Sequence, residues 1–203
     1  QLEMELNPAH QFVLTVTKLL SKFQHRPKNL LVFVNPQCGK GKTNSTERTL
    51  SHNRKVFALG KAKAVFEEKV LPLFQEARIG VKTIYTDRPN QAQDYVEKQS
   101  IGHYDGLVCV GGDGMFSELC HGLLSRTARQ NDLNLNDPKV RLVRPKLRIG
   151  VIPAGSTDAV VFGTTGHNDP VTSALQIILG ESVAIDITTV GNSISVIIIT
   201  TPR

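Results

Sequence analysis

The sequence predicts an α/β protein whose open, mostly parallel β-sheet is flanked by helices. Short apolar segments alternate along the chain with stretches whose apolar residues recur at helical spacing, as in chains that build a parallel sheet from strand–helix units. The apolar segments are nearly continuous, for example over residues 30–34 and 147–152, which is typical of strands covered on both faces. Three of them run into polar junctions that contain glycine, at residues 35–42, 111–114 and 153–158.

The first half of the chain begins with an amphipathic helix. Apolar residues recur at helical spacing over residues 8–23, within an N-terminal segment of residues 1–25, and the following Arg26-Pro27 pair ends the helix. Residues 43–63 are polar and basic with little periodicity, which predicts a loop or an insertion. The other predicted elements are a strand at 30–34, a helix at 64–77, a strand at 81–86, a turn at 86–90 and a helix at 91–98.

The second half continues the alternation. A continuous apolar strand at residues 106–110 is followed by a helix over residues 115–127, whose apolar residues share one face. Residues 131–146 are polar and contain two X–Pro pairs, which indicates a surface loop. The remaining predicted elements are a strand at 147–152, a helix at 171–179, a strand at 183–189 and a strand within the apolar run 194–199.

Length and composition suit a single domain. The chain has 203 residues, of which 40% are hydrophobic, and this is enough to bury a core. No stretch approaches the roughly 18 apolar residues of a membrane span, and no signal-peptide pattern is present. Because the chain does not begin with Met, we expect a fragment or a processed form.

The cysteines predict a reducing compartment. Cys38, Cys109 and Cys120 are unevenly spaced and form no Cys-x-x-Cys pair, which excludes a disulfide scaffold and favours the cytoplasm. Cys109 lies in a predicted strand and Cys120 on the apolar face of a predicted helix. Both are therefore expected to be small core residues rather than nucleophiles.

The formal net charge of +6 is spread over lysines and arginines along the chain. We interpret it as a solvated basic surface, with no nucleic acid as partner, because aromatic residues do not alternate with the basic ones and no zinc spacing or RNA-binding signature is present. A basic face favours anionic membrane surfaces and would also suit polyphosphate substrates. No pattern in the sequence predicts the oligomeric state.

The most informative junction is Gly111-Gly112-Asp113-Gly114, which joins strand 106–110 to the next helix. Glycines let the backbone turn sharply and approach a ligand closely, and a helix start offers N–H groups to a phosphate. Asp113 would lie beside that phosphate, which a carboxylate repels. We therefore interpret Asp113 as a base, or as a group that orients an attacking hydroxyl, in phosphoryl transfer.

Two further features fit this chemistry less specifically. Glu118 lies in the first turn of the helix after the motif. There it either complements the helix dipole or approaches a nucleotide or a metal-bound water, and its position favours neither. The junction at 35–42 contains two glycines and two lysines and could hold phosphates with backbone N–H groups, although it lacks the Walker A spacing.

The three junctions are predicted to meet in one cleft. Each follows a strand, and ligands of open α/β sheets bind beyond the carboxyl ends of the strands. One such junction could be ordinary turn chemistry. Three at the same edge of a sheet predict a ligand site.

The same junctions carry a resemblance to a known family. Their residues are Asn35-Pro36 with Gly39-Lys40-Gly41, the 111–114 motif with Glu118, and Pro153-Ala154-Gly155-Ser156-Thr157. Over roughly residues 26–189 the chain resembles the diacylglycerol kinase catalytic domain family, which includes diacylglycerol, sphingosine and ceramide kinases. The resemblance implies a catalytic, ATP-binding domain over 26–189 with an insertion at about 43–63, followed by a divergent tail at 190–203.

The resemblance also implies an activity: a cytoplasmic, peripherally membrane-associated kinase that moves phosphate from ATP to a lipid's primary hydroxyl, with ceramide as the favoured lipid. Mg²⁺ would be carried mainly by the ATP phosphates, with no metal site of the protein's own. Asp113 would be the catalytic base, and Gly111, Gly112, Asp113 and Gly114 would line the meeting point of phosphate and lipid. The implied ATP contacts are Asn35, Pro36, Gln37, Gly39, Thr86, Asp87, Arg88, Pro89, Asn90, Glu118, Gly155, Ser156 and Thr157.

The chain departs from the family's pattern in ways that leave alternatives open. Cys38 stands where the family usually has glycine, and the family's second, β-sandwich domain does not follow before Arg203. We therefore expect a nucleotide-binding half that binds ATP weakly and transfers little or no phosphate alone. The alternatives are a truncated form that binds a nucleotide, a lipid or a partner, and another small-molecule kinase with the same motif, such as an NAD kinase.

Overall fold

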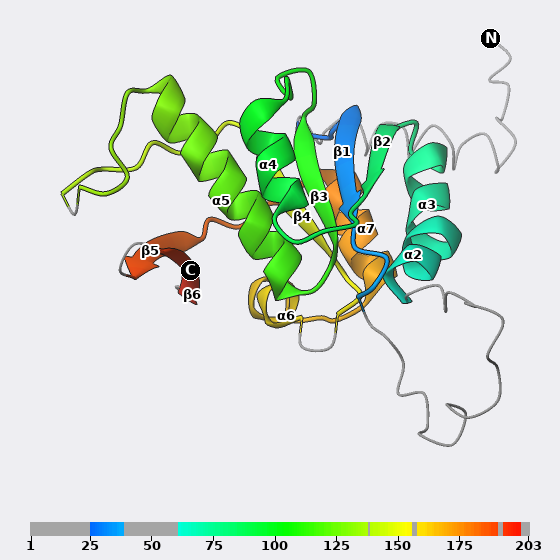
Figure 1. Cartoon of the computed structure of the whole chain (residues 1–203). Helices are drawn as coiled ribbons and strands as arrows, with labels where there is room; N and C mark the ends of the chain where they lie inside the picture. Colours follow the sequence, from blue (N-terminus) through cyan, green and yellow to red (C-terminus); the bar gives the residue numbers. More distant parts are fainter. Residues whose placement is uncertain (1–24, 39–60, 138, 156–157, 191–192, 200–203) are drawn as a thin grey trace, which may run out of the picture.

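The computed structural model describes residues 25–38, 61–137, 139–155, 158–190 and 193–199 (Figure 1). The predicted N-terminal helix at 8–23 and most of the predicted insertion lie outside these residues. The described part is an α/β unit with helices on both faces of one parallel sheet. This confirms the fold class that the sequence predicts.

The sheet consists of four parallel strands in the order β2-β1-β3-β4. Because all four run in the same direction, their carboxyl ends share one edge. The strands are β1 (Asn29–Val34), β2 (Gly80–Tyr85), β3 (Gly106–Gly111) and β4 (Arg148–Pro153).

Two apolar layers cover the sheet, as the continuous apolar strands predict. In β1, Leu30 and Val32 pack into one layer and Leu31 and Phe33 into the other, and all four are buried. Burial on both faces is the physical reason that these strands do not alternate with polar residues. One layer contains residues of α4 (Gln91–Lys98) and α5 (Asp113–Gln130), and the other contains residues of α2 (Lys61–Ala64), η2 (Val65–Val70), α3 (Leu71–Glu76) and α7 (Pro170–Leu179).

The helical segment before β2 begins earlier than the sequence predicts. Lys61, which the prediction assigned to the end of the 43–63 insertion, is the first residue of α2. The segment continues through the π-helical stretch η2 into α3, which has Pro72 in its first turn. A proline ring clashes with the carbonyl four residues earlier in an α-helix, and the wider π turns just before Pro72 relieve this clash.

The C-terminal part contains an element that the sequence analysis missed. A short helix, α6 (Ala159–Thr165), follows β4, at residues to which no element was assigned. The predicted strand at 183–189 begins later, as β5 (Asp186–Val190), and pairs with β6 (Ser193–Ile199) in an antiparallel hairpin separate from the main sheet (Figure 1). The hairpin lies next to α5.

The structure confirms that two of the cysteines are core residues. Cys109 and Cys120 are buried, and burial raises the pKa of the Cys120 thiol to about 12 and the pKa of Cys109 well above its usual value. Both thiols are therefore protonated at neutral pH, as expected of core residues. Within the described ranges, none of the helices has the length and apolar character to cross a membrane.

The packing of α5 on α4 depends on Gly122. A Cβ at this position would lie 2.8 Å from the carbonyl oxygen of Gln93 and 3.0 Å from Cβ of Val96. We expect Gly122→Ala to lower the free energy of unfolding by about 1–3 kcal/mol, because the backbone of α4 must move. Urea denaturation followed by circular dichroism measures this change.

The matched control is Gly163→Ala in α6, where no described atom lies within 4 Å of the added Cβ. Alanine there should leave stability unchanged or raise it by up to about 1 kcal/mol. Equal effects of the two substitutions would show that helix propensity, and not the α4–α5 contact, sets the result.

Candidate functional site

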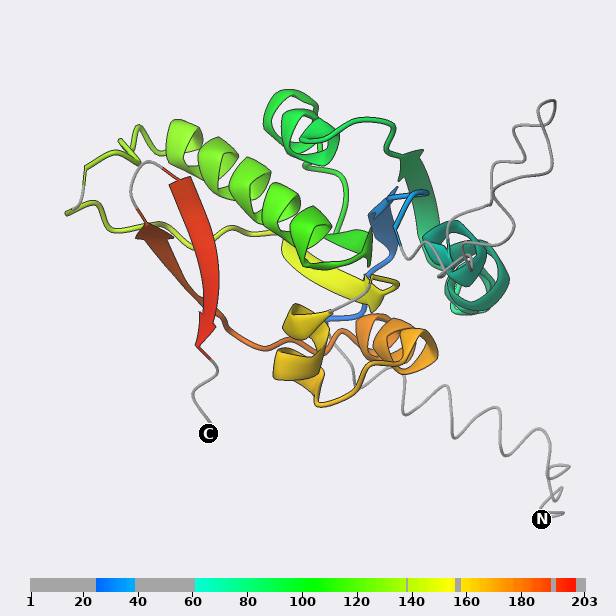
Figure 2. The same cartoon turned by 60° about the horizontal axis from the view of Figure 1, so that its bottom comes forward.

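The predicted junctions lie at the shared carboxyl edge of the sheet, which Figure 2 brings forward. Backbone hydrogen bonds join each junction to its neighbour. Asn35 donates to the Val110 carbonyl over 3.2 Å, and Ala154 donates to the Gly111 carbonyl over 3.2 Å. On the other side, the Thr86 N–H donates to the carbonyl of Val34 over 2.9 Å. Four strand ends therefore form one continuous rim.

Glycines permit the closest contacts within this rim. A Cβ on Gly155 would lie 2.7 Å from Gly112 Cα, which is too close for any side chain. A Cβ on Gly111 would lie 3.8 Å from Asn35 Cβ and 3.9 Å from Cys38 Sγ. The structure thus brings the three junctions together, as the sequence predicts.

Asp113 is the first residue of α5, and its carboxylate is held by a second helix. One oxygen accepts from the Val160 N–H over 3.0 Å and the other from the Ala159 N–H over 3.1 Å. These donors are the first two N–H groups of α6, so Asp113 caps that helix from outside. Beside it Gly114 is exposed, and no described atom lies within 4 Å of the position of a Cβ there. The Asp113 carboxylate is therefore fixed by two bonds, and the next residue in the chain borders open space.

A second carboxylate, Asp158, lies beside Asp113 and was not among the predicted site residues. It is 5% exposed and accepts from the Gly155 N–H over 2.9 Å. Burial, followed by the charge of Asp113, raises its pKa, against the opposing effects of the Gly155 hydrogen bond and of Lys61. Its position in the 153–158 junction was the only signal in the sequence.

The start of α2 also reaches this site. Lys61 is close enough to Asp158 to lower its pKa, and the Ala62 N–H donates to the Cys38 carbonyl over 3.4 Å. Sequence reasoning placed Lys61 in the insertion because the residues before it show no periodicity. The structure instead makes α2 the element that brings a positive charge to the paired carboxylates.

Glu118 is engaged by the start of another helix. Its Oε2 accepts from the Ala92 N–H over 3.3 Å, near the start of α4, where the side chain of Asn90 makes no capping hydrogen bond. Glu118 therefore caps an N–H group in the first turn of α4 from outside that helix. This bond engages one carboxylate oxygen, Oε2, and the nucleotide contact of Glu118 stays a prediction.

The segment 86–90 lies at the same rim, but its side chains differ in direction. Thr86 is buried and its hydroxyl donates to the Val34 carbonyl over 3.4 Å. Arg88 pairs with Asp94 on the exposed side of α4 at 2.7 Å. Asp87, Pro89 and Asn90 are exposed, and Asn90 has a positive φ of 59°.

The first junction forms a compact turn. The Gln37 N–H donates to Asn35 Oδ1 over 3.0 Å, and Cys38 N–H donates to the Asn35 carbonyl over 3.1 Å. Asn35 and Pro36 are half-buried, and Gln37 is exposed. The predicted contacts Gly39, Ser156 and Thr157 lie outside the described residues.

The described side chains offer no complete metal cage. Among them no group of three or more His, Cys, Asp and Glu residues is placed to hold an ion. Mg²⁺ usually keeps several waters and binds through one or two carboxylates together with substrate phosphates. An ion held mainly by the phosphates of a bound nucleotide needs only one neighbouring carboxylate, and Asp113 at the glycine rim is a donor of that type.

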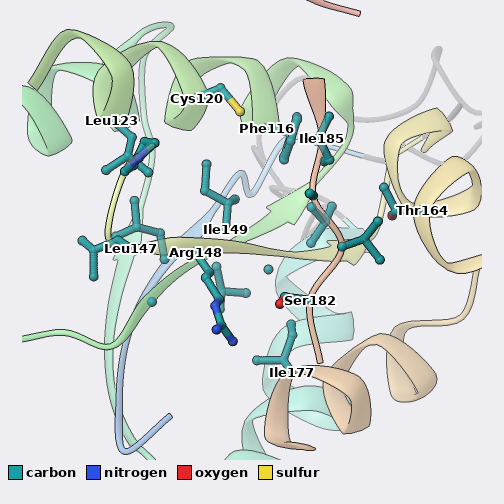
Figure 3. A pocket seen from close by; sticks show the side chains of 18 of the residues that line it. Phe116, Cys120, Leu123, Leu147, Arg148, Ile149, Thr164, Ile177, Ser182 and Ile185 are labelled. Atoms are coloured by element: carbon teal, nitrogen blue, oxygen red, sulfur yellow. The ribbon is translucent and has the colours of Figure 1, made fainter. Parts of the chain in front are cut away.

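A separate cavity of about 980 Å³ lies along β4, the edge strand of the sheet that pairs with β3. Figure 3 shows Phe116, Cys120 and Leu123 of α5 on one side, with Ile149 of β4 and Ile177 of α7 facing the same space. Its described lining is mainly apolar and includes none of the predicted site residues. The predicted site is therefore the glycine rim and not this cavity.

Relatives of the chain are lipid kinases. It is 44% identical over 181 residues to ceramide kinase of Homo sapiens, an alignment that covers 89% of this chain and 30% of that protein. It is 34% identical over 175 residues to ceramide kinase 1 of Caenorhabditis elegans, covering 84% and 28%. Sphingosine kinase 1 of Arabidopsis thaliana is 35% identical over 169 residues, covering 81% and 28%. The chain thus spans less than a third of the length of these relatives.

A solved structure has the same fold. A diacylglycerol kinase from Bacillus anthracis str. Sterne superposes with a TM-score of 0.54 at 17% sequence identity, over 79% of this chain and 43% of that one. The family model described as the diacylglycerol kinase catalytic domain matches residues 58–190, more than half of the chain. This chain belongs to the diacylglycerol kinase catalytic domain family.

Proposed function

We propose that the glycine rim binds ATP and directs its γ-phosphoryl group to the primary hydroxyl of a lipid, with ceramide as the preferred acceptor. The observation that carries this proposal is the meeting of three strand-end junctions around one fixed carboxylate, Asp113. Membership of a lipid kinase family supports the reaction class, and similarity to ceramide kinases supports the acceptor.

Asp113 is the proposed base. Its carboxylate keeps one orientation because two N–H groups of α6 hold it, and the space at Gly114 admits an acceptor hydroxyl. The carboxylate accepts the hydroxyl proton as the hydroxyl oxygen attacks the γ-phosphorus; the bond from that phosphorus to the β,γ-bridging oxygen breaks and ADP leaves. In-line positioning supplies most of the rate. Mg²⁺, when bound with ATP, neutralises charge on the phosphates.

The remaining rim residues are proposed to place the nucleotide. Backbone N–H groups of the 111–114 junction suit phosphate oxygens. The 35–39 and 155–157 junctions are proposed to shape the phosphate site around them, because the N–H groups of Gln37, Cys38 and Gly155 already donate within the protein. Exposed Asp87, Pro89 and Asn90 are proposed to approach the nucleoside, while Thr86 and Arg88 act by fixing their segment, because their side chains bond to Val34 and Asp94.

A lipid acceptor implies that the protein works at a membrane. The net charge of +6 favours peripheral contact with an anionic surface, and we propose a cytoplasmic location for the protein. The relatives are about three times longer than the aligned part. This difference supports a second proposal, that the 203-residue chain alone is a weak nucleotide-binding module.

Transfer of radiolabelled γ-phosphate from MgATP in mixed micelles tests the proposed reaction. Ceramide, sphingosine, diacylglycerol and NAD serve as parallel acceptors. We expect label in ceramide before the other acceptors, at a low rate for this chain. Label in NAD alone would contradict the lipid kinase proposal, and no label with measurable ATP binding would favour the binding module.

Asp113→Asn tests the proposed base. Asparagine keeps the size of the side chain but cannot take the hydroxyl proton, so we expect the rate of transfer to fall about 10²–10⁴-fold. The exposed Asp132, whose φ of 52° asparagine tolerates, provides the control substitution Asp132→Asn. Transfer by Asp113→Asn at the wild-type rate would remove Asp113 from the chemistry.

Glu118 is expected to act through α4 and not through its charge. Glu118→Gln keeps an oxygen for the Ala92 N–H, so the free energy of unfolding and the Kd for ATP should stay near wild type. Glu118→Ala leaves that N–H uncapped and should lower the free energy of unfolding by about 1 kcal/mol. Calorimetric ATP titration of both variants distinguishes the roles: equal weakening by Gln and Ala would indicate a direct contact of the carboxylate charge with the nucleotide complex.

A further inference from the structure

The start of α6 has an unusual arrangement of caps. Asp158 occupies the N-cap position, where an aspartate normally accepts from the helix's own first N–H groups. Here its carboxylate turns back to the Gly155 N–H, at 2.9 Å, and makes no capping bond to α6 among the described residues. The N–H groups of Ala159 and Val160 are capped by Asp113 instead.

The backbone of Asp158 explains this exchange. Its φ of 48° and ψ of 40° place it in the left-handed region, which aspartate visits far less readily than glycine does. A left-handed residue reverses the chain between the 153–158 junction and α6. As a result the N–H groups of Ala159 and Val160 point at Asp113, which lies 46 positions before Ala159 in the sequence.

Several contacts hold Asp158 in this strained conformation. The residue is 5% exposed, its carboxylate accepts from the Gly155 N–H, and the side chain of Asn168 lies near enough to lower its pKa. Gly155 in turn lies against Gly112, next to Asp113 in the chain. The Asp158 side chain therefore closes a ring of contacts that runs through Gly155, Gly112, Asp113 and the start of α6.

We propose that Asp158 is a positioning residue: it holds the left-handed turn that aims the Ala159 and Val160 N–H groups at Asp113 and so fixes the carboxylate for the reaction. The catalytic part of this inference rests on the function proposed above. The hydrogen-bonding part does not, because it concerns contacts that exist without substrate.

The side chain and the backbone of Asp158 can be separated by three substitutions. Asp158→Asn keeps an oxygen for the Gly155 N–H, and asparagine tolerates the left-handed conformation. Asp158→Gly permits the conformation but removes the oxygen. Asp158→Ala removes the oxygen and disfavours the conformation. All three substitutions are at the same position. Asparagine and glycine differ in the oxygen that accepts from Gly155, and glycine and alanine differ in how readily they adopt the left-handed conformation.

Amide NMR on the ¹⁵N-labelled chain measures the contact directly. We expect Asp158→Ala and Asp158→Gly to shift the Ala159 and Val160 amide resonances upfield, and to speed their exchange about tenfold or more as the bonds to Asp113 are lost. Asp158→Asn should leave both near wild type. Unchanged resonances of the β1 and β3 amides confirm that each variant is folded, and unchanged Ala159 and Val160 amides in the alanine variant would overturn the proposal.

Transfer kinetics test whether the contact matters for the reaction. Loss of the fixed carboxylate should lower kcat of Asp158→Ala about 100-fold, with the KM for ATP nearly unchanged and Asp158→Asn close to wild type. In the Asp113→Asn background, Asp158→Ala should lower kcat by less than about a further twofold, because Asp158 acts through Asp113. If the double variant instead showed the product of the two single reductions in kcat, Asp158 would act independently of Asp113 and the positioning role would be overturned.

The two failures can be told apart. If Asp113→Asn alone retains full transfer, the proposed base is wrong, whereas the amide measurements still decide whether Asp158 holds Asp113. If the amides of the alanine variant do not move, the positioning role is wrong, whatever the effect of Asp113→Asn.

Discussion

The contact between the backbones of Gly112 and Gly155 is the constraint on which the rest of the site depends. A Cβ on Gly155 would lie 2.7 Å from Gly112 Cα, so the 153–158 junction could not approach the 111–114 junction this closely with a side chain at Gly155. The register of β3 and β4 aligns Gly111 with Pro153 at the strand ends, and the Ala154 N–H continues the ladder to the Gly111 carbonyl. The parallel sheet therefore delivers both junctions to one place, and glycine lets them meet.

This contact brings together two carboxylates that are 45 positions apart in the sequence. Asp113 follows Gly112 directly, and Asp158 bonds back to the N–H of Gly155. Burial and the neighbouring charge of Asp113 raise the pKa of Asp158, while Lys61 of α2 counters the effect. The start of α6 supplies two N–H donors to Asp113, which is itself the first residue of α5. The site is acidic at its centre and is stabilised by helix ends around it.

Most of the sheet could be predicted because its signals are local. Strands covered on both faces are continuous apolar runs, and β1, β3 and β4 lie within a residue or two of their predicted ranges. The short helix α6 could not be predicted in this way. Its seven residues are too few to show a period, and its first N–H groups are satisfied by Asp113 and not by a local cap.

The sequence alone determined the parallel α/β fold and the convergence of the glycine junctions, because apolar periodicity and strand-end glycines are local properties of the chain. Tertiary structure decided how the side chains are used. It placed Glu118 on the N–H of Ala92, turned Arg88 toward Asp94 and brought Lys61 near Asp158. The contacts of Glu118 with Ala92 and of Lys61 with Asp158 join elements far apart in the sequence, and the Arg88–Asp94 pair joins a turn to the helix after it, so no periodic pattern reveals these partners.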